Sequence, residues 1–102
     1  MASSVGSGGA FISSEKVVTT AGTAVALAAS ADFWRAITIK AKNGNTGQVY
    51  VGGANVNSST NDGLDAGESL SMETRSKIFD LALIFIDSDV SGEGVDFYAV
   101  KT

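Results

Sequence analysis

The segment from residue 35 to residue 53 (RAITIKAKNGNTGQVYVGG) constrains the fold most, because apolar and polar residues alternate on both sides of a turn. Ile37 and Ile39 precede the turn, and Val49 and Val51 follow it. Successive side chains of a strand point to opposite faces, so each half has one apolar and one polar face. We predict a single β-hairpin here, because the Asn and Gly residues of 43–47 accept the positive φ of tight turns. An isolated hairpin is not stable in water, so the rest of the chain must cover the apolar face.

The same alternation predicts further short strands along the chain. The other expected strands are Phe11–Thr20 with Val17 inward, Thr23–Leu27 (or a helical turn), Glu68–Glu73 with Leu70 and Met72 inward, Ile78–Ile86, and Val95–Lys101. Ile78–Ile86 is apolar on both faces, which is typical of a covered central strand or of an interface. About seven or eight short strands, with turns every 8–12 residues and no convincing helix, predict an all-β fold, either an antiparallel β-sandwich or a jelly roll.

A chain of 102 residues is long enough for one domain with one modest core. Residues 1–9 (MASSVGSGG) are small, polar and rich in glycine, so we expect a flexible N-terminal arm, which could instead order against a neighbouring subunit. Residues 10–102 are then expected to form a single β-sandwich domain.

Composition argues against several classes of function. The chain has no cysteine and no histidine, so it lacks thiolate ligands and both the commonest general base and the commonest metal ligand. No serine lies in a recognisable nucleophile turn, and we expect no enzymatic activity and no cofactor. The net charge is −4 with only seven scattered Lys and Arg, which does not favour nucleic-acid binding. No apolar run reaches the roughly 18–20 residues of a membrane span, so we expect no membrane association.

One segment resembles half of a calcium-binding loop. In residues 87–92 (DSDVSG), oxygen-bearing side chains alternate at Asp87, Asp89 and Ser91, and Gly92 follows at the turn. The second half does not fit, because Tyr98 stands where a bidentate carboxylate belongs. A polar turn explains the segment equally well, so Asp87, Asp89 and Ser91 are a weak calcium candidate. The polar segment 57–68, which begins at Asn57, is also rich in side-chain oxygens and is expected to be a solvated loop.

Three aromatic residues on predicted strands could form a platform for stacking against sugars: Trp34, Tyr50 and Tyr98. Tyr50 falls on the polar face of the predicted hairpin, so we expect it to be the most exposed of the three. Trp34 either covers the open end of the core or contacts a subunit or ligand.

Two sequence motifs in the middle of the chain resemble motifs of small virion proteins of tailed bacteriophages. They are residues 45–53 (NTGQVYVGG) and residues 64–69 (LDAGES), with a Ser-rich loop between them. In these proteins a phrase of the form N-x-G-x-V-Y-V-G is followed by a polar loop and then by L-x-A-G-E-S. The resemblance covers about the middle quarter of the chain. It implies a fold and a lineage rather than a reaction.

The resemblance implies a jelly-roll or β-sandwich structural protein of the phage particle, most simply a capsid decoration protein. Such a protein would form a homotrimer on the outer surface of the capsid, bound to the major capsid protein, after assembly in the host cytoplasm. The alternative is a carbohydrate- or receptor-binding module of a tail or fibre. The candidate interface residues are Phe11, Ile12, Trp34, Ile84 and Ile86.

Overall fold

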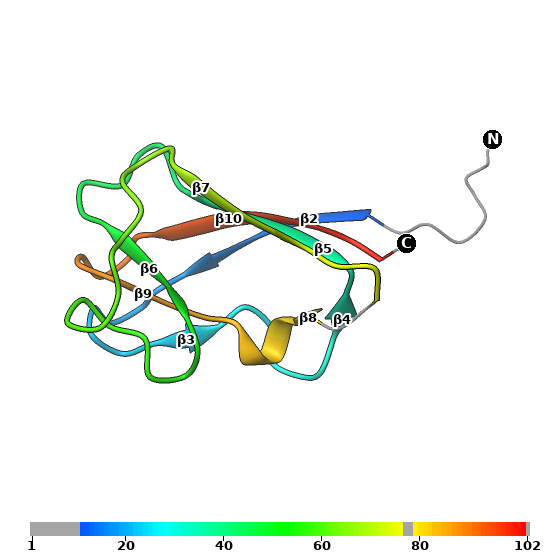
Figure 1. The fold of residues 1–102 in the computed structure, drawn as a ribbon. Helices are drawn as coiled ribbons and strands as arrows, with labels where there is room; N and C mark the ends of the chain where they lie inside the picture. The colour runs from blue at the N-terminus through cyan, green and yellow to red at the C-terminus, as the bar shows by residue number, and fades with distance from the viewer. Residues whose placement is uncertain (1–10, 77–78, 102) are drawn as a thin grey trace.

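Almost all regular structure in this protein is β-strand (Figure 1). The computed structural model describes residues 11–76 and 79–101, so the predicted arm at 1–9 lies outside the described residues. The strands are β2 (Phe11–Val17), β3 (Val25–Ala26), β4 (Phe33–Trp34), β5 (Ala36–Ala41), β6 (Val49–Gly52), β7 (Ser69–Glu73), β8 (Phe79–Asp80), β9 (Phe85–Ser88) and β10 (Gly94–Val100). A single turn of 3-10 helix, η1 (Leu81–Leu83), separates β8 from β9.

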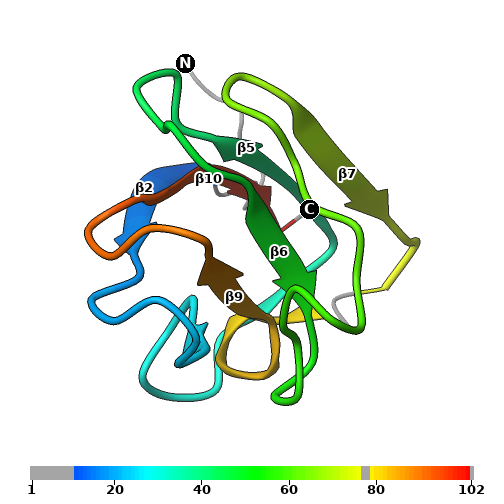
Figure 2. The ribbon, with the colours of Figure 1, turned by 90° about the vertical axis from the view of Figure 1, so that its left-hand side faces the viewer.

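The strands form two facing layers, as the view along the strands shows (Figure 2). One layer is a four-stranded sheet in the order β2-β10-β5-β7, and the other is a three-stranded sheet in the order β3-β9-β6. A two-residue pairing of β4 with β8 adds to them, and every pairing is antiparallel. The first described strand, β2, pairs with the last, β10, and β3 pairs with β9, while Leu64 bridges Val49 at the start of β6. This is the strand order of a jelly roll. The predicted all-β sandwich or jelly roll is confirmed.

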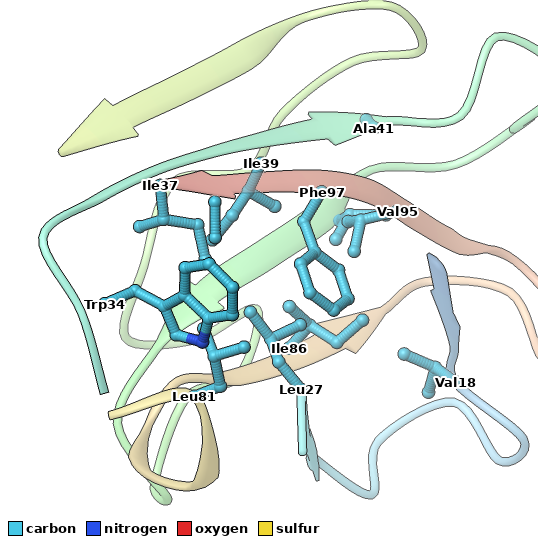
Figure 3. Packing of buried hydrophobic residues seen from close by; sticks show 12 residues of the cluster. Val18, Leu27, Trp34, Ile37, Ile39, Ala41, Leu81, Ile86, Val95 and Phe97 are labelled. Atoms are coloured by element: carbon cyan, nitrogen blue, oxygen red, sulfur yellow. The ribbon is translucent and has the colours of Figure 1, made fainter. Parts of the chain in front are cut away.

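The core lies between these layers and follows the alternation seen in the sequence. On β5 and β10 every second side chain is buried, because one face of each strand is turned to the facing sheet. Trp34, Ile37 and Leu81 gather at one end of the core, and Phe97 lies near Ile86 in the middle (Figure 3). The buried cluster consists of Val18, Leu27, Trp34, Ile37, Ile39, Ala41, Val49, Leu81, Ile86, Val95, Phe97 and Ala99.

The predicted hairpin of residues 35–53 is wrong. β5 pairs with β10 and β7, whereas β6 pairs with β9 in the facing sheet. The segment between them crosses from one layer to the other, and Gly44 does not have the positive φ of a tight hairpin turn. The alternation identified the buried faces of both strands correctly, but it carries no information about which strands pair.

The crossing segment is held by the turn before β10 rather than by its own strands. Glu93 accepts hydrogen bonds from the backbone N–H groups of Thr46 and Gly47 at 2.8 and 3.0 Å. The Asn45 side chain donates to the carbonyl of Gly94 at 2.9 Å. These bonds fasten the crossing to a segment nearly fifty residues later.

The strand predicted over Ile78–Ile86, whose first residue lies outside the described residues, is not one strand: residues 79–86 form β8, η1 and the start of β9. Asp80 interrupts it, because its Oδ1 accepts the N–H groups of Ala82 and Asp32, each at 3.0 Å. This cap turns the chain, so that Leu81 is buried while Leu83 is 69% exposed.

Two predictions about edge strands also differ from the structure. Val17 is 38% exposed, and its neighbour Val18 is the buried residue. Leu70 is 39% exposed, although it lies opposite the buried Ile39, because β7 is at the edge of the larger sheet. Over the described residues, no helix is long and apolar enough to cross a membrane.

Candidate functional site

A polar hollow on the surface brings together segments that are far apart in the sequence. Its walls come from the turn after β2, the long loop after β6, and the end of β9. The lining residues are Ala21, Gly22, Asn57, Ser58, Ser59, Thr60, Asp87, Ser88 and Asp89. Both oxygen-rich segments singled out in the sequence therefore contribute to one surface, which the sequence alone did not indicate.

Asp87, at the end of β9, holds the turn after β2 in place. The side chain is 2% exposed, and its Oδ1 accepts the N–H groups of Gly22 at 2.9 Å and of Ser88 at 2.8 Å. Gly22 has a φ of +92°, a conformation that glycine adopts at little cost. Ser91 reinforces the same contact, since its hydroxyl accepts the N–H of Ala21 at 2.9 Å. Buried carboxylates are stable when their oxygens are hydrogen-bonded, as here.

Asp89 also lines the hollow, and its carboxylate accepts hydrogen bonds from two different donors. Its Oδ1 accepts the Tyr50 hydroxyl at 2.7 Å, and its Oδ2 accepts the Gln48 N–H at 3.0 Å. The hydrogen bond to Asp89, together with burial, raises the pKa of Tyr50 to about 12. Tyr50 therefore stays protonated and acts as a fixed donor to Asp89.

The residues of the weak calcium candidate thus serve two separate hydrogen-bonded contacts. Asp87 and Ser91 cap the turn at residues 21–22, and Asp89 points toward Tyr50. Across residues 11–76 and 79–101, no group of three or more acidic side chains is placed to hold a metal ion. These contacts engage Oδ1 of Asp87, both carboxylate oxygens of Asp89 and the Ser91 hydroxyl. The calcium site stays a prediction.

The long loop contributes side chains that are not engaged in the same way. Asn57 organises the loop, since its Oδ1 accepts the Ser59 N–H at 2.8 Å and its Nδ2 donates to the Asn55 carbonyl at 3.1 Å. Ser58 and Ser59 are exposed on the rim of the hollow. The surface therefore offers hydroxyl, amide and carboxylate groups, a set suited to polar ligands that carry several hydroxyl groups.

The three aromatic residues do not form a platform. Tyr50 was expected to be exposed but is 6% exposed, because the loop passes over it: a Cβ added to Gly63 would lie 2.8 Å from its ring. Trp34 is 3% exposed and belongs to the core, with the Lys101 ammonium 4.7 Å from the ring centroid. Its indole Nε1 is buried and has no hydrogen-bond partner among the described residues. Only Tyr98 is substantially exposed.

The candidate interface residues divide into three groups by their exposure. Trp34 and Ile86 are core residues, with side chains 3% and 0% exposed, so they are not available on the surface of this fold. Ile12 and Ile84 are half-buried and pack against the core. Phe11 is 66% exposed and is the accessible member of the set.

Phe11 also makes a contact that the sequence did not indicate. Its ring stacks on that of Tyr98, with centroids 6.5 Å apart and planes inclined by 16°. The two residues are diagonal neighbours, since Tyr98 lies opposite Ser13 and Phe11 lies opposite Val100. The pair marks the outer face of the four-stranded sheet near the start of β2.

No family model matches the chain, and the searches of curated proteins and of solved structures find no similar protein. Functional conclusions therefore depend on the residues themselves.

Proposed function

We propose that this chain is a structural protein of a tailed-phage particle, and specifically a decoration protein that binds the major capsid protein on the outer surface of the head. The starting point is the resemblance of residues 45–53 and 64–69 to small virion proteins. Binding would cement the shell: each bound copy adds contacts that are present only in the assembled particle, which stabilises that state by mass action.

One observation carries this proposal: the two segments that show the resemblance form a single structural unit. Val49 and Leu64 exchange two backbone hydrogen bonds of 3.0 and 2.7 Å, and the Gln48 side chain donates to Asp65 at 2.9 Å. Gly67 then turns the chain into β7 with a φ of +83°. Residues 45–53 and 64–69 therefore contribute to the framework of the sandwich, which favours a structural role over a chemical one.

The exposed apolar surface is compatible with binding to another protein. Phe11 and Leu83 are 66% and 69% exposed, and Phe11 and Tyr98 form an exposed, stacked aromatic pair. Aromatic side chains of this kind are enriched where proteins bind one another.

The copy number of this chain in purified particles, measured by quantitative mass spectrometry against the coat protein, tests the proposal. A fixed, simple ratio to the coat protein is the expected result. A handful of copies per particle would contradict decoration and indicate a tail, spike or fibre component. Absence from the particle would overturn any virion role.

A second candidate is a carbohydrate- or receptor-binding module of a tail or fibre, and the polar hollow favours it. Its residues Ser58 and Ser59 are exposed and line the same hollow as Asp87 and Asp89. A glycan-binding assay with the paired variants Ser58→Ala and Ser59→Ala tests it, with Ser71→Ala on β7 as a control away from the hollow. Loss of glycan binding only in the rim variants would support this candidate, and no binding by the unaltered protein would remove it. A thermal midpoint that does not change in millimolar calcium would count against a calcium-dependent form.

A further inference from the structure

β2 is an edge strand of the four-stranded sheet, and within the described residues no strand pairs with its outer side (Figure 2). We propose that a second copy of this chain pairs with this edge, β2 against β2, antiparallel, about a two-fold axis at Ser14. The inference does not depend on a role in a phage particle. It depends on which backbone groups face outward and on which side chains would then meet.

The hydrogen bonds around β10 establish which backbone groups of β2 face outward. The N–H of Val18 donates to the carbonyl of Glu93 at 2.9 Å, and the N–H of Lys42 donates to the carbonyl of Gly94 at 3.1 Å. Odd-numbered residues of β10 therefore bond β2, and even-numbered ones bond β5. Alternation along a strand then directs the backbone groups of Ile12, Ser14 and Lys16 toward β10. The outward-facing residues are Phe11, Ser13, Glu15 and Val17.

Only a few registers bring outward-facing residues opposite one another. An axis at Ser14 overlaps the whole of β2, residues 11–17. An axis at Glu15 would place Glu15 opposite its own copy, and like charges directly opposite are destabilising. An axis at Ser13 would shorten the overlap to residues 11–15 and place Phe11 opposite a carboxylate. The axis at Ser14 is therefore the most favourable of the three.

The side chains are complementary in this register. Phe11 lies opposite Val17 of the second copy, and these are the two exposed large apolar residues of β2, at 66% and 38%. Ser13 lies opposite Glu15 of the second copy, where its hydroxyl can donate to the carboxylate. Lys16 lies opposite Ile12 of the second copy, so no two like charges meet. Pairing thus covers apolar side chains that a lone edge strand would leave in water.

The charge of Glu15 is compensated within its own subunit. Its carboxylate lies 2.5 Å from the Lys42 ammonium, which also contacts Asp96 at 2.6 Å. Hydrogen bonds to Asp96 first, and then to Glu15, raise the pKa of Lys42 above its usual value, so this lysine stays charged at neutral pH. An isolated charge on an edge strand would oppose pairing with another strand. Because Lys42 compensates the charge of Glu15, that opposition is weaker here.

This arrangement closes with two copies. A two-fold antiparallel pairing uses the same edge of both subunits, so the edge is not available to a third copy. It therefore differs from the homotrimer that the resemblance implies, and the mass in solution distinguishes them. Multi-angle light scattering of the full chain is expected to give twice the monomer mass of 10.4 kDa. A monomer at high micromolar concentration, or a trimer, would overturn the proposal.

A single cysteine reports the register directly, because the chain has none of its own. Opposite residues of a pair that is not hydrogen-bonded have Cα atoms about 4.5 Å apart, within the range of a disulfide. Under mild oxidation Ser14→Cys is expected to form a covalent dimer, whereas Ser71→Cys on the other edge strand, β7, is not. Equal cross-linking of the two variants, or none at residue 14, would contradict the register.

A proline pair tests which edge associates. The N–H of Ser13 faces outward, so Ser13→Pro removes a donor needed only for pairing between copies, and proline is tolerated at such edge positions. The matched control is Ser71→Pro on the other edge strand, β7. The N–H of Ala41 donates to the carbonyl of Glu68, and the N–H of Thr74 donates to the carbonyl of Arg35. Even-numbered residues of β7 therefore bond β5, and the N–H of Ser71 in the unaltered protein faces outward. Ser13→Pro should yield a folded monomer and Ser71→Pro a dimer. A dimer that persists in Ser13→Pro would show that another surface associates and would overturn the proposal.

Discussion

The carboxylate of Glu93 accepts both the backbone N–H and the hydroxyl of Thr46, each at 2.8 Å. A third bond comes from the N–H of Gly47 at 3.0 Å. Through these contacts one side chain holds the segment that carries the chain from one sheet to the other. The crossing replaces the hairpin that the sequence suggested, so its stability rests on a residue remote in the chain.

Acid should weaken this crossing, and Glu93→Gln should remove that sensitivity. Hydrogen bonds from Gly47 and Thr46 hold the pKa of Glu93 below its usual value of 4.5. The stabilisation is therefore present above the unfolded-state pKa and is lost as the pH falls through the folded-state pKa. Thermal unfolding from pH 7 to pH 3 should show a difference between the two proteins that shrinks toward the acid end. A difference that is constant with pH would contradict this role.

Tyr50→Phe should destabilise the fold by about 1–2 kcal/mol, because it leaves the Asp89 oxygen without its donor. Urea unfolding measures this change. A loss within about 0.5 kcal/mol would contradict the role of the hydroxyl, since exposed substitutions that break no contact also fall in this range.

The tyrosine titration is a separate test of the same contact. In Tyr98→Phe, Tyr50 is the remaining tyrosine, and its phenolate absorbance should appear with a midpoint of about 12. Because the folded-state pKa is raised, the stabilisation is complete below the unfolded-state pKa of about 10 and is lost as the pH rises through the folded-state value. A midpoint near 10 in the folded protein would contradict the hydrogen bond.

Ile86→Ala should cost about 2–5 kcal/mol, because it opens a cavity between the two sheets. Ile86 is fully buried, whereas Leu83, three residues earlier on η1, is 69% exposed. Leu83→Ala is therefore the matched control and should stay within about 0.5 kcal/mol in the same urea measurement. Equal costs for the two variants would contradict the burial of Ile86.

Gly94→Ala should be more damaging than Gly22→Ala. A Cβ at residue 94 would clash with the Lys16 carbonyl of β2, so the pairing of β2 with β10 would have to shift. At residue 22 the space is open, and only the φ of +92° opposes a side chain, at about 1–2 kcal/mol. Thermal midpoints of the two variants give the order, and a larger loss at residue 22 would show that β2 does not approach β10 this closely.

The fold class could be predicted because alternation is a local signal. Val95, Phe97 and Ala99 occupy every second position of β10, and all three are buried as the pattern indicates. Pairing partners could not be predicted in the same way. The pattern of β6 specifies which residues face inward, but nothing near it in the sequence specifies β9 as its neighbour.

Prediction of the candidate site failed for a related reason. Asp87 and Asn57 were each noticed as parts of oxygen-rich segments, but their meeting in one hollow depends on the three-dimensional arrangement. The burial of Tyr50 likewise follows from Gly63 and its loop crossing above the ring. Alternation describes a strand's two faces and cannot report a loop that later covers one of them.

The pairing of β2 with β10 joins the beginning of the described chain to its end. β10 also lies between β2 and β5, so the larger sheet cannot form until that strand is available. Contacts between such distant segments make folding slow. During synthesis the earlier strands emerge before their central partner exists, and we expect the domain to fold only after β10 has left the ribosome. A chain that lacks β10 would then be a substrate for proteases rather than a smaller version of the domain.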